Sequence, residues 1–420
     1  MLTRAFPILS LIVASVLFSP VKAQEKYSLQ QALQTAQEHN LFLKTEQLNV
    51  NLAETEIISA KIRPNFVLNN ETLQLMKSSE FEPNTDWHSP YNREAMWQVS
   101  KPFQIAGQRK NKIEVADKSM AYAQSTYGDN QRHLYYEVAK SWLEVWTLQK
   151  QLDVLTIAKG NMDTLVLNNQ HRYKNQVITQ TELYRTELLS RQYEIQYKSA
   201  VQELNNTKKE LGLLMGVQDH ISIDPADGFM PDFPPTAPDD LLNQALNNRT
   251  DIIAAKQWVE VSQSNINLQK SLAYPQPEFG LIYNPQNQVP YFGISFAVEL
   301  PFTNRNQGEI KKSQLEKKQA EFQLSAIERQ LETEVRTAYE SYQINRQNSL
   351  SFEAVIAQSQ IILDNVKYAY LRGGTTIIDF LEAQRSWLET QQLYYEAVQE
   401  LRQSHIQLLF SSGLINQLAQ

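Results

Sequence analysis

The chain is 420 residues long and contains two copies of one unit, and this internal repeat constrains its fold more than any other feature. At an offset of 213 (245 − 32), Ala32-Leu33 recurs as Ala245-Leu246 and Pro64-x-Phe66 recurs as Pro277-x-Phe279. At an offset of 199, Pro102-Phe103 recurs as Pro301-Phe302, and at 197, Tyr173, Thr179 and Gly216 recur as Tyr370, Thr376 and Gly413. Such an ordered series is typical of repeat architectures, so both halves should adopt the same fold.

The boundaries of the two copies follow from composition. The N-terminus is typical of an export signal over residues 1–23, with Arg4, a short apolar run and a small-residue cleavage site at Ala23. A buried N-terminal helix is the alternative. A Pro-rich stretch, residues 217–240, separates a first repeat at 24–216 from a second at 241–420 and is expected to be a linker. The drop in offset from 213 to 199 places a longer loop, around residues 77–93, in the first copy.

Each unit is expected to contain a helix, two strands, a very long helix and a return helix. The expected first helices are 28–62 and 239–272, and the expected strands are 65–76, 94–104, 277–285 and 290–300. The expected long helices are 105–170 and 304–368, and the return helices are 179–213 and 376–412. With only 12 glycines, the chain suits long uninterrupted helices better than a turn-rich β fold.

The long helices carry a coiled-coil seam, in which apolar residues are spaced alternately four and three apart. Nine of the twelve seam positions from Tyr127 to Val166 are apolar, and so are nine of the twelve from Leu331 to Tyr370. A seam of this length predicts coiled-coil packing of long helical hairpins. The first helix and the return helix of a unit add up to the length of the long helix, so the two laid end to end could pair with it.

The strands alternate between apolar and small or polar residues, which is the pattern of transmembrane barrel strands. The residues expected to face lipid are Phe66, Leu68, Trp97, Val99, Phe279, Leu281, Phe292, Ile294, Phe296 and Val298. A soluble sheet with one face on a core is the alternative. Four strands cannot close a barrel, and an open edge cannot sit in lipid, whereas three copies would supply twelve strands.

Composition excludes several other classes of protein. Without Cys, the chain can form no disulfide, thiolate metal site or cysteine nucleophile. A mean hydropathy of −0.45 excludes a bundle of membrane-spanning helices, and a net charge of −7 offers no attraction to nucleic acid. The six His do not stand at ligand spacing from one another, so no metal site and no cofactor are expected. No catalytic motif is present, so an enzyme is not expected either.

The second helix–helix break carries a specific motif. Its residues, Tyr370-Leu-Arg-Gly373-Gly374-Thr375-Thr376-Ile-Ile-Asp379-Phe-Leu-Glu382-Ala-Gln, resemble the signature of the TolC family of outer-membrane efflux ducts. The first break departs from it, because Gln176 stands where Gly is expected and Glu182 where the acid is expected. The order of elements and the short second loop are most similar to the heavy-metal-efflux (Czc-type) branch.

This resemblance implies a mainly α protein with a transmembrane β part. Long coiled-coil hairpins and four barrel strands per chain would assemble as a homotrimer, giving a 12-stranded β-barrel and an α-helical periplasmic tunnel. The resemblance also implies a location in the outer membrane of a Gram-negative bacterium. There, a passive duct would bind a periplasmic adaptor and an inner-membrane pump, and the sequence leaves open whether metal cations or drugs are exported. The alternatives are a periplasmic coiled-coil scaffold without a pore and, on weaker grounds, a nonspecific porin or an adhesin stalk.

By the same resemblance, Glu182, Asp379 and Glu382 occupy positions of pore-constricting carboxylates. The residues expected to form a tip network or to dock the adaptor are Tyr173, Thr179, Tyr370, Arg372, Gly373, Gly374 and Thr376. A purely structural role is open for two of the acids, because Thr179-x-x-Glu182 and Thr376-x-x-Asp379 both match a helix capping box. Glu382 lies one turn further along, so capping does not explain it.

Overall fold

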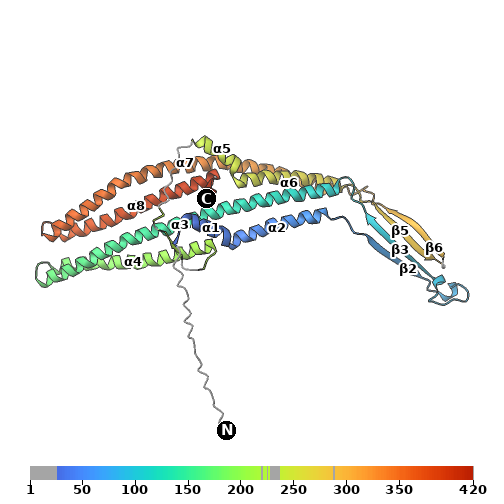
Figure 1. The fold of residues 1–420 in the computed structure, drawn as a ribbon, viewed down its shortest axis with the longest axis horizontal. Coiled ribbons are helices and arrows are strands. Elements are labelled where there is room, and N and C mark those ends of the chain that lie inside the picture. The colour runs from blue at the N-terminus through green and yellow to red at the C-terminus, as the bar shows by residue number, and fades with distance from the viewer. Residues whose placement is uncertain (1–25, 219–220, 225, 228–236, 287–288, 420) are drawn as a thin grey trace, which may run out of the picture.

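The computed structural model describes residues 26–218, 221–224, 226–227, 237–286 and 289–419. The predicted signal peptide and half of the predicted linker lie outside these residues. The chain is elongated, with helical hairpins at one end, strands at the other, and the helix breaks near the middle (Figure 1). No helix in the described part of the chain is both long enough and apolar enough to cross a bilayer.

Both units have the predicted order of elements. The first contains α1 (Leu29–His39), α2 (Leu41–Lys61), β2 (Val67–Gln74), β3 (Arg93–Pro102), α3 (Gln108–Lys174) and α4 (Gln180–Met215). The second contains α5 (Pro238–Asn248), α6 (Thr250–Leu272), β5 (Glu278–Gln286), β6 (Val289–Ala297), α7 (Gln307–Leu371) and α8 (Ile377–Ser412). The two-residue strands β1 (Lys26–Tyr27) and β4 (Ser222–Ile223) pair in parallel, and short 3-10 turns lie at Ser78–Glu80, Pro90–Asn92 and Ile415–Ala419.

The first helix of each unit is broken in two, which differs from the single helices expected at 28–62 and 239–272. Asn40 leaves the helical conformation, and its side chain caps α2 by accepting from the Leu43 N–H at 2.9 Å. The corresponding break is at Arg249. Aligning the two breaks gives an offset of 209 (249 − 40) between the first helices of the two units. At this offset Ala245 corresponds to Ala36, which is one helical turn away from the Ala32 that the sequence match pairs with it.

The breaks lie where the return helices end. Gly216 and Gly413 terminate α4 and α8 in the left-handed conformation, with φ of 71° and 75°. A Cβ on Gly216 would lie 2.3 Å from the His39 carbonyl oxygen, so only glycine allows this approach. The α4 and α2 helices both pack on α3, and α8 and α6 both pack on α7, which confirms that two shorter helices accompany one long helix (Figure 1).

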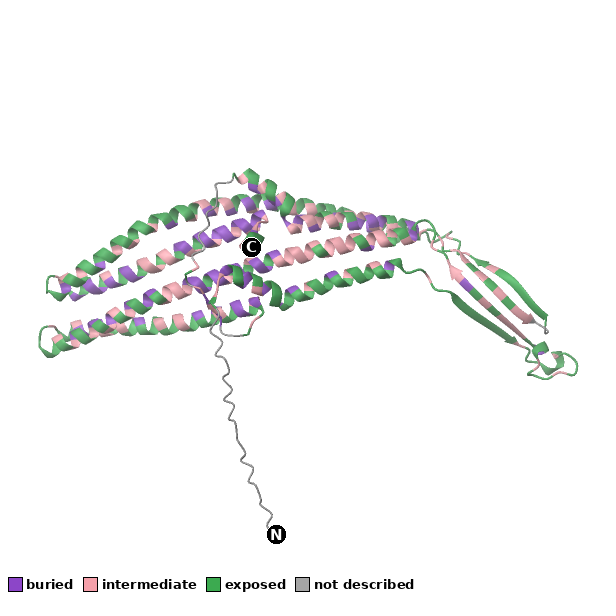
Figure 2. Ribbon diagram, in the orientation of Figure 1, coloured by how far each residue is buried: buried purple, intermediate pink, exposed green. Residues whose placement is uncertain are grey.

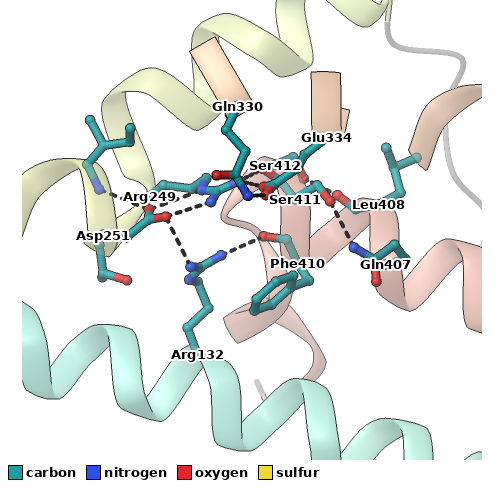
Figure 3. A network of polar contacts seen from close by, with 12 residues as sticks. Arg132, Arg249, Asp251, Gln330, Glu334, Gln407, Leu408, Phe410, Ser411 and Ser412 are labelled. Carbon is teal, nitrogen blue, oxygen red and sulfur yellow. Dashed lines mark hydrogen bonds and ion pairs between the residues drawn. The ribbon is translucent and has the colours of Figure 1, made fainter. Parts of the chain in front are cut away.

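A buried ionic network holds the second break (Figure 3). The Arg249 guanidinium binds both oxygens of Asp251, at 3.0 and 2.6 Å, and Glu334 at 2.7 Å. It also donates to the Ser411 carbonyl at 3.2 Å, while Arg132 donates to the Phe410 carbonyl at 3.1 Å. Two cations therefore satisfy the last carbonyls of α8, where the helix dipole favours positive charge. Burial alone would raise the pKa of Asp251, but the bonds from Arg249 and the charge of Arg132 hold it below its usual value.

The coiled-coil seam is confirmed. All twelve predicted positions of α3 and all twelve of α7 are buried or half-buried. They contribute to three apolar clusters that lie between the helices, and Figure 2 shows the buried positions concentrated there rather than in the strands.

The four long strands form one antiparallel sheet in the order β2-β3-β5-β6. Its register aligns the predicted apolar residues in cross-strand rows. Leu68, Val99, Leu281 and Ile294 form one row, and Asn70, Trp97, Tyr283 and Phe292 form the next. The opposite face is mixed. Gln98 donates to Ser295 and Asn284 donates to Glu94 on it, and Val67, Leu73, Met96 and Ile282 lie on the same face. Strand β3 pairs with β5, so the sheet joins the two units.

Two predicted lipid-facing residues lie outside the strands. Val298 follows the end of β6 and is half-buried, and Phe66 precedes β2 and is exposed. Val298 departs from the expectation because β6 ends at Ala297, before the predicted end at residue 300. Within the described residues, β2 and β6 each have one edge without a partner strand.

The first prediction concerns the helix junction. Gly216→Ala should destabilise the chain by at least about 2 kcal/mol, because it adds left-handed strain to a clash with the His39 carbonyl. Thermal unfolding of the detergent-solubilised protein measures the change. Gly160→Ala is the matched control, since its Cβ meets nothing within 4 Å, and it should stabilise by about 0.5–1 kcal/mol. Equal changes in unfolding temperature for the two substitutions would contradict the close contact between Gly216 and the His39 carbonyl.

Candidate functional site

The candidate site is the pair of turns where the long helices meet the return helices. Both turns have the same hydrogen bonds, in which the first two residues after the cap donate back into the last helical turn. In the α7–α8 turn, Gly373 N–H donates to Tyr370 O at 3.1 Å and Gly374 N–H to Ala369 O at 2.8 Å. In the α3–α4 turn, Gln176 donates to Tyr173 at 2.9 Å and Val177 to Arg172 at 2.8 Å. This is the Schellman arrangement for ending a helix.

The two turns differ in the residue that adopts the left-handed conformation. Gly373 has φ of 75°, whereas Gln176 occupies the equivalent position with φ of 60°. A side chain at this position costs about 1–2 kcal/mol. Gly373 has a positive φ and Gly374 has none, because a single left-handed residue completes the turn. Both glycines are exposed at the end of the hairpin.

Both return helices open with a capping box, as predicted. Glu182 accepts from the Thr179 N–H at 2.7 Å, and Asp379 accepts from the Thr376 N–H at 3.0 Å. The Thr376 and Thr375 hydroxyls also donate to Asp379, at 2.6 and 2.7 Å. These donors lower the pKa of Asp379, with the Thr376 side chain contributing most, so this carboxylate stays ionised at mildly acidic pH.

The three candidate constriction carboxylates have different surroundings. Asp379 and Glu382 are exposed near the start of α8, and Glu182 is half-buried at the start of α4. Each capping box brings together a Thr and an acid of the same hairpin. Capping therefore accounts for Glu182 and Asp379 without excluding a second role, while Glu382 remains an exposed acid beyond the box.

A buried polar chain joins the two hairpins beside the tips. The Tyr370 hydroxyl donates to Asn169 Oδ1 at 2.9 Å, and Asn169 Nδ2 donates to the Thr186 hydroxyl at 2.9 Å. The Thr186 hydroxyl in turn donates to the Glu182 carbonyl at 2.9 Å. Tyr370 is 3% exposed and stacks on Phe380, and burial raises the pKa of its hydroxyl. This chain connects α7 through α3 to α4.

The predicted tip residues are only partly brought together. Tyr173 is the counterpart of Tyr370 in the first unit, yet it is 39% exposed. The Arg372 guanidinium lies 4.1 Å from the ring centroid of Tyr368, and it is Arg172, at 4.9 Å, that covers the Tyr370 ring. Arg372 therefore packs on Tyr368, and Arg172 packs on Tyr370.

Sequence reasoning missed Asn169 and Thr186, the two residues that link Tyr370 to α4. A signal for Asn169 was available, since it stands three residues after Val166 and is the next position of the α3 seam. A buried Asn in an apolar seam is a known device for setting register. The sequence around Thr186 does not single this residue out, because it lies in α4, for which the sequence analysis identifies no apolar seam.

No group of three or more His, Asp or Glu side chains in the described ranges is placed to hold a metal ion. The arrangement at the tips is instead one of fixed helix ends, exposed carboxylates and a buried hydrogen-bonded contact. Such an arrangement can present charge at an opening and hold two hairpins together.

Comparison with known proteins gives consistent results. Residues 241–414 match a family model described as "Outer membrane efflux protein". The cobalt-zinc-cadmium resistance protein CzcC of Cupriavidus metallidurans is 21% identical over 383 residues, covering 89% of this chain and 87% of that protein. The fold is similar to that of a Pseudomonas aeruginosa membrane protein, with a TM-score of 0.76, 16% identity and coverage of 92% and 93%. It is also similar to the Campylobacter jejuni CmeC outer membrane channel, with a TM-score of 0.75, 13% identity and coverage of 98% and 94%.

The second prediction concerns the left-handed turn residues. Gln176→Gly should stabilise the first tip by about 0.5–1 kcal/mol, because relief of left-handed strain exceeds the entropy cost of glycine. Gly373→Gln in the second tip should destabilise by a similar amount. Hydrogen exchange of the turn amides and thermal unfolding measure both changes. Destabilisation by Gln176→Gly would show that contacts of the glutamine side chain outweigh backbone strain.

Proposed function

From the match of residues 241–414 to the outer membrane efflux protein family, and from the similarity of the fold to a solved membrane protein over 92% of the chain, we infer that this protein is a passive, trimeric export duct. The resemblance to the TolC family seen in the sequence is confirmed, and the protein is an outer-membrane efflux channel. The trimer, the passive mechanism and the partners are the further parts of the proposal.

The observation that carries the proposal is the apolar face of the sheet. Phe292 and Ile294 are 82% and 86% exposed, whereas the apolar seams of the long helices are buried or half-buried. One apolar row, from Leu68 to Ile294, crosses all four strands, and Gln98, Ser295 and Glu94 lie on the opposite face. Apolar outside and polar inside is the pattern of a membrane barrel with an aqueous lumen. A soluble scaffold would have no reason to leave this face uncovered.

The unpaired strand edges support the trimer. Strand β2 of one copy can pair with β6 of the next, and three copies then close a twelve-stranded barrel with no edge exposed to lipid. The helices that continue from these edges also carry exposed apolar residues, Leu48 and Leu52 on α2 and Leu315 and Phe322 on α7. A second copy covering the strand edge would also bring these two helix faces together.

The turns at the ends of the helical hairpins support a pore that narrows there and contacts a periplasmic adaptor. Three copies would place Asp379 and Glu382 around one opening, and rings of carboxylates favour cations. The turn at Gly373 and Gly374 is exposed and offers backbone for a periplasmic adaptor, which would couple the duct to an inner-membrane pump. The cobalt-zinc-cadmium resistance named for the similar CzcC favours metal cations as the exported class. Tyr370 and Asn169 would then hold the hairpins of one copy together when the opening is narrow.

The third prediction tests the barrel. Ile294→Arg should impair trimer formation and membrane insertion, since Ile294 lies near the middle of β6 and arginine at the lipid-facing midplane costs about 2–4 kcal/mol per copy. Ser295→Arg is the neighbouring control and should be tolerated better, because Ser295 lies on the polar face. Light scattering in detergent and insertion into vesicles measure the two variants. The proposed barrel would be wrong if the two variants lost assembly and insertion to the same extent, or if the unmodified chain were a stable folded monomer.

The fourth prediction tests the constriction. The double substitution Asp379→Asn with Glu382→Gln removes six charges per trimer while keeping side-chain size. Conductance in planar bilayers should lose its preference for cations and its block by multivalent cations, because the ring no longer focuses positive ions. Thr376→Ala, which weakens the cap of α8 and keeps all three candidate carboxylates, serves as a structural comparison. Unchanged ion preference in the double variant would assign Asp379 and Glu382 a structural role only.

A further inference from the structure

A strongly basic zone surrounds the junction between the helices and the strands. The residues within about two helical turns of the strands on the helix side are 55–66, 101–114, 266–278 and 298–313. They contain ten bases and five acids, and the acids are Glu56, Glu114, Glu278, Glu299 and Glu309. The ten bases, called here the basic collar, are Lys61, Arg63, Lys101, Arg109, Lys110, Lys112, Lys270, Arg305, Lys311 and Lys312. The zone therefore carries a formal charge of +5 (10 − 5) in a chain whose net charge is −7.

The basic collar is available at the surface. Eight of its ten residues are exposed, and only Lys101 and Arg109 are half-buried. Arg109 donates to the Lys61 carbonyl at 2.8 Å and Arg305 to the Pro301 carbonyl at 3.1 Å, and both keep their charge in doing so. Lys312 lies 3.5 Å from Glu309 in an exposed pair. The positive charge is thus mostly free of compensating acids.

Lys101 fixes the position of the basic collar relative to the apolar face. It pairs across the sheet with Phe279, which in turn pairs with Phe296. Its ammonium lies 4.5 Å from the ring centroid of Phe66. Lys101 therefore stands on the apolar face of the sheet, in the last row before the helices begin. This is where a lysine reaches from an apolar belt toward the charged boundary of a membrane.

Two of the acids do not offset the basic collar on the apolar side of the sheet. Glu278 accepts a hydrogen bond from Ser100, and both lie on the face of the sheet opposite Lys101. Glu114 pairs with Lys118, which lies outside the zone, at 3.4 Å. The side that faces lipid in the proposed barrel is therefore more basic than the count alone indicates.

The other end of the strands has the opposite balance. Residues 75–94, between and beside β2 and β3, contain Lys77 and Arg93 against Glu80, Glu82, Asp86 and Glu94. Basic residues at both ends would indicate only generic solubility. Their concentration at the helix-side end indicates a partner that lies beside that end alone.

We propose that the basic collar binds the headgroups of anionic phospholipids in the leaflet that faces the helices. The proposal rests on the barrel of the proposed function, because only an apolar face set in lipid brings headgroups to this level. Anionic headgroups attract lysine and arginine at the membrane surface, and ten such residues per chain would form thirty around a trimer. The lipid contact would orient the barrel and set its depth in the membrane.

The test measures the lipid preference of the intact trimer. Purified trimer of the full chain, in detergent, is incubated with equal amounts of phosphatidylglycerol and phosphatidylcholine at low salt, and retained lipid is counted by native mass spectrometry. The unmodified trimer should retain phosphatidylglycerol at least about fivefold over phosphatidylcholine, because each cation near the surface contributes about that factor. High salt should reduce the preference, because it screens exposed charges.

Neutral substitutions identify the residues responsible. Lys101→Gln, Lys110→Gln and Lys311→Gln together should lower the ratio at least about twofold, while the seven bases that remain keep it above one. Lys209→Gln, an exposed lysine on α4 far from the strands, is the control and should leave the ratio unchanged.

The outcomes separate this proposal from the proposed function. If the trimer inserts into vesicles and conducts but retains both lipids equally, lipid binding by the basic collar is wrong and the proposed export duct stands. An equal loss of preference in the Lys209 control also overturns it, because the effect would then be one of net charge. A chain that neither assembles nor inserts overturns both proposals.

Discussion

The open edges of the four-stranded sheet are the constraint on which the rest of the structure depends. The β2 and β6 strands each leave a row of backbone donors and acceptors without a partner in the chain, while the apolar rows on one face are largely exposed. Neither feature is tolerable for an isolated monomer in water or in lipid. Closing the edges with further copies solves both problems at once. It also places the helices side by side around a lumen and their tips at one end.

In both units, the end of the return helix contacts the break in the first helix in the same way. In both, a left-handed glycine ends the return helix against the break of the first helix, and the residue at the break donates to a carbonyl two residues before that glycine. Asn40 binds Leu214 O in the first unit and Arg249 binds Ser411 O in the second. The first joint is neutral, whereas the second is an ionic network with Asp251, Glu334 and Arg132. A buried arginine is tolerated there because every charge around it is paired.

The tips of the two units also differ. Tyr370 is buried against Asn169, while its counterpart Tyr173 remains exposed, and the position equivalent to Asn169 in α7 is Val366. Only one of the two tyrosines can therefore make this hydrogen bond. A ring of six hairpins from three copies would alternate between a polar contact within each copy and a different contact between copies. Such alternation offers a way to open the ring at three seams while the other three stay closed.

The sequence by itself determined the features that repeat locally: the two units, the long helices, their seam, the capped return helices and the alternating strands. These depend on periodic patterns and helix-end chemistry, which act within a few residues. Only the tertiary structure decided the breaks at Asn40 and Arg249, the pairing of β3 with β5, and the contact of Asn169 with Tyr370. Each of these depends on what a distant part of the chain packs against it, as the carbonyl of Ser411 does for Arg249. A helical pattern does not reveal such a break, because its cause is a backbone group more than a hundred residues away.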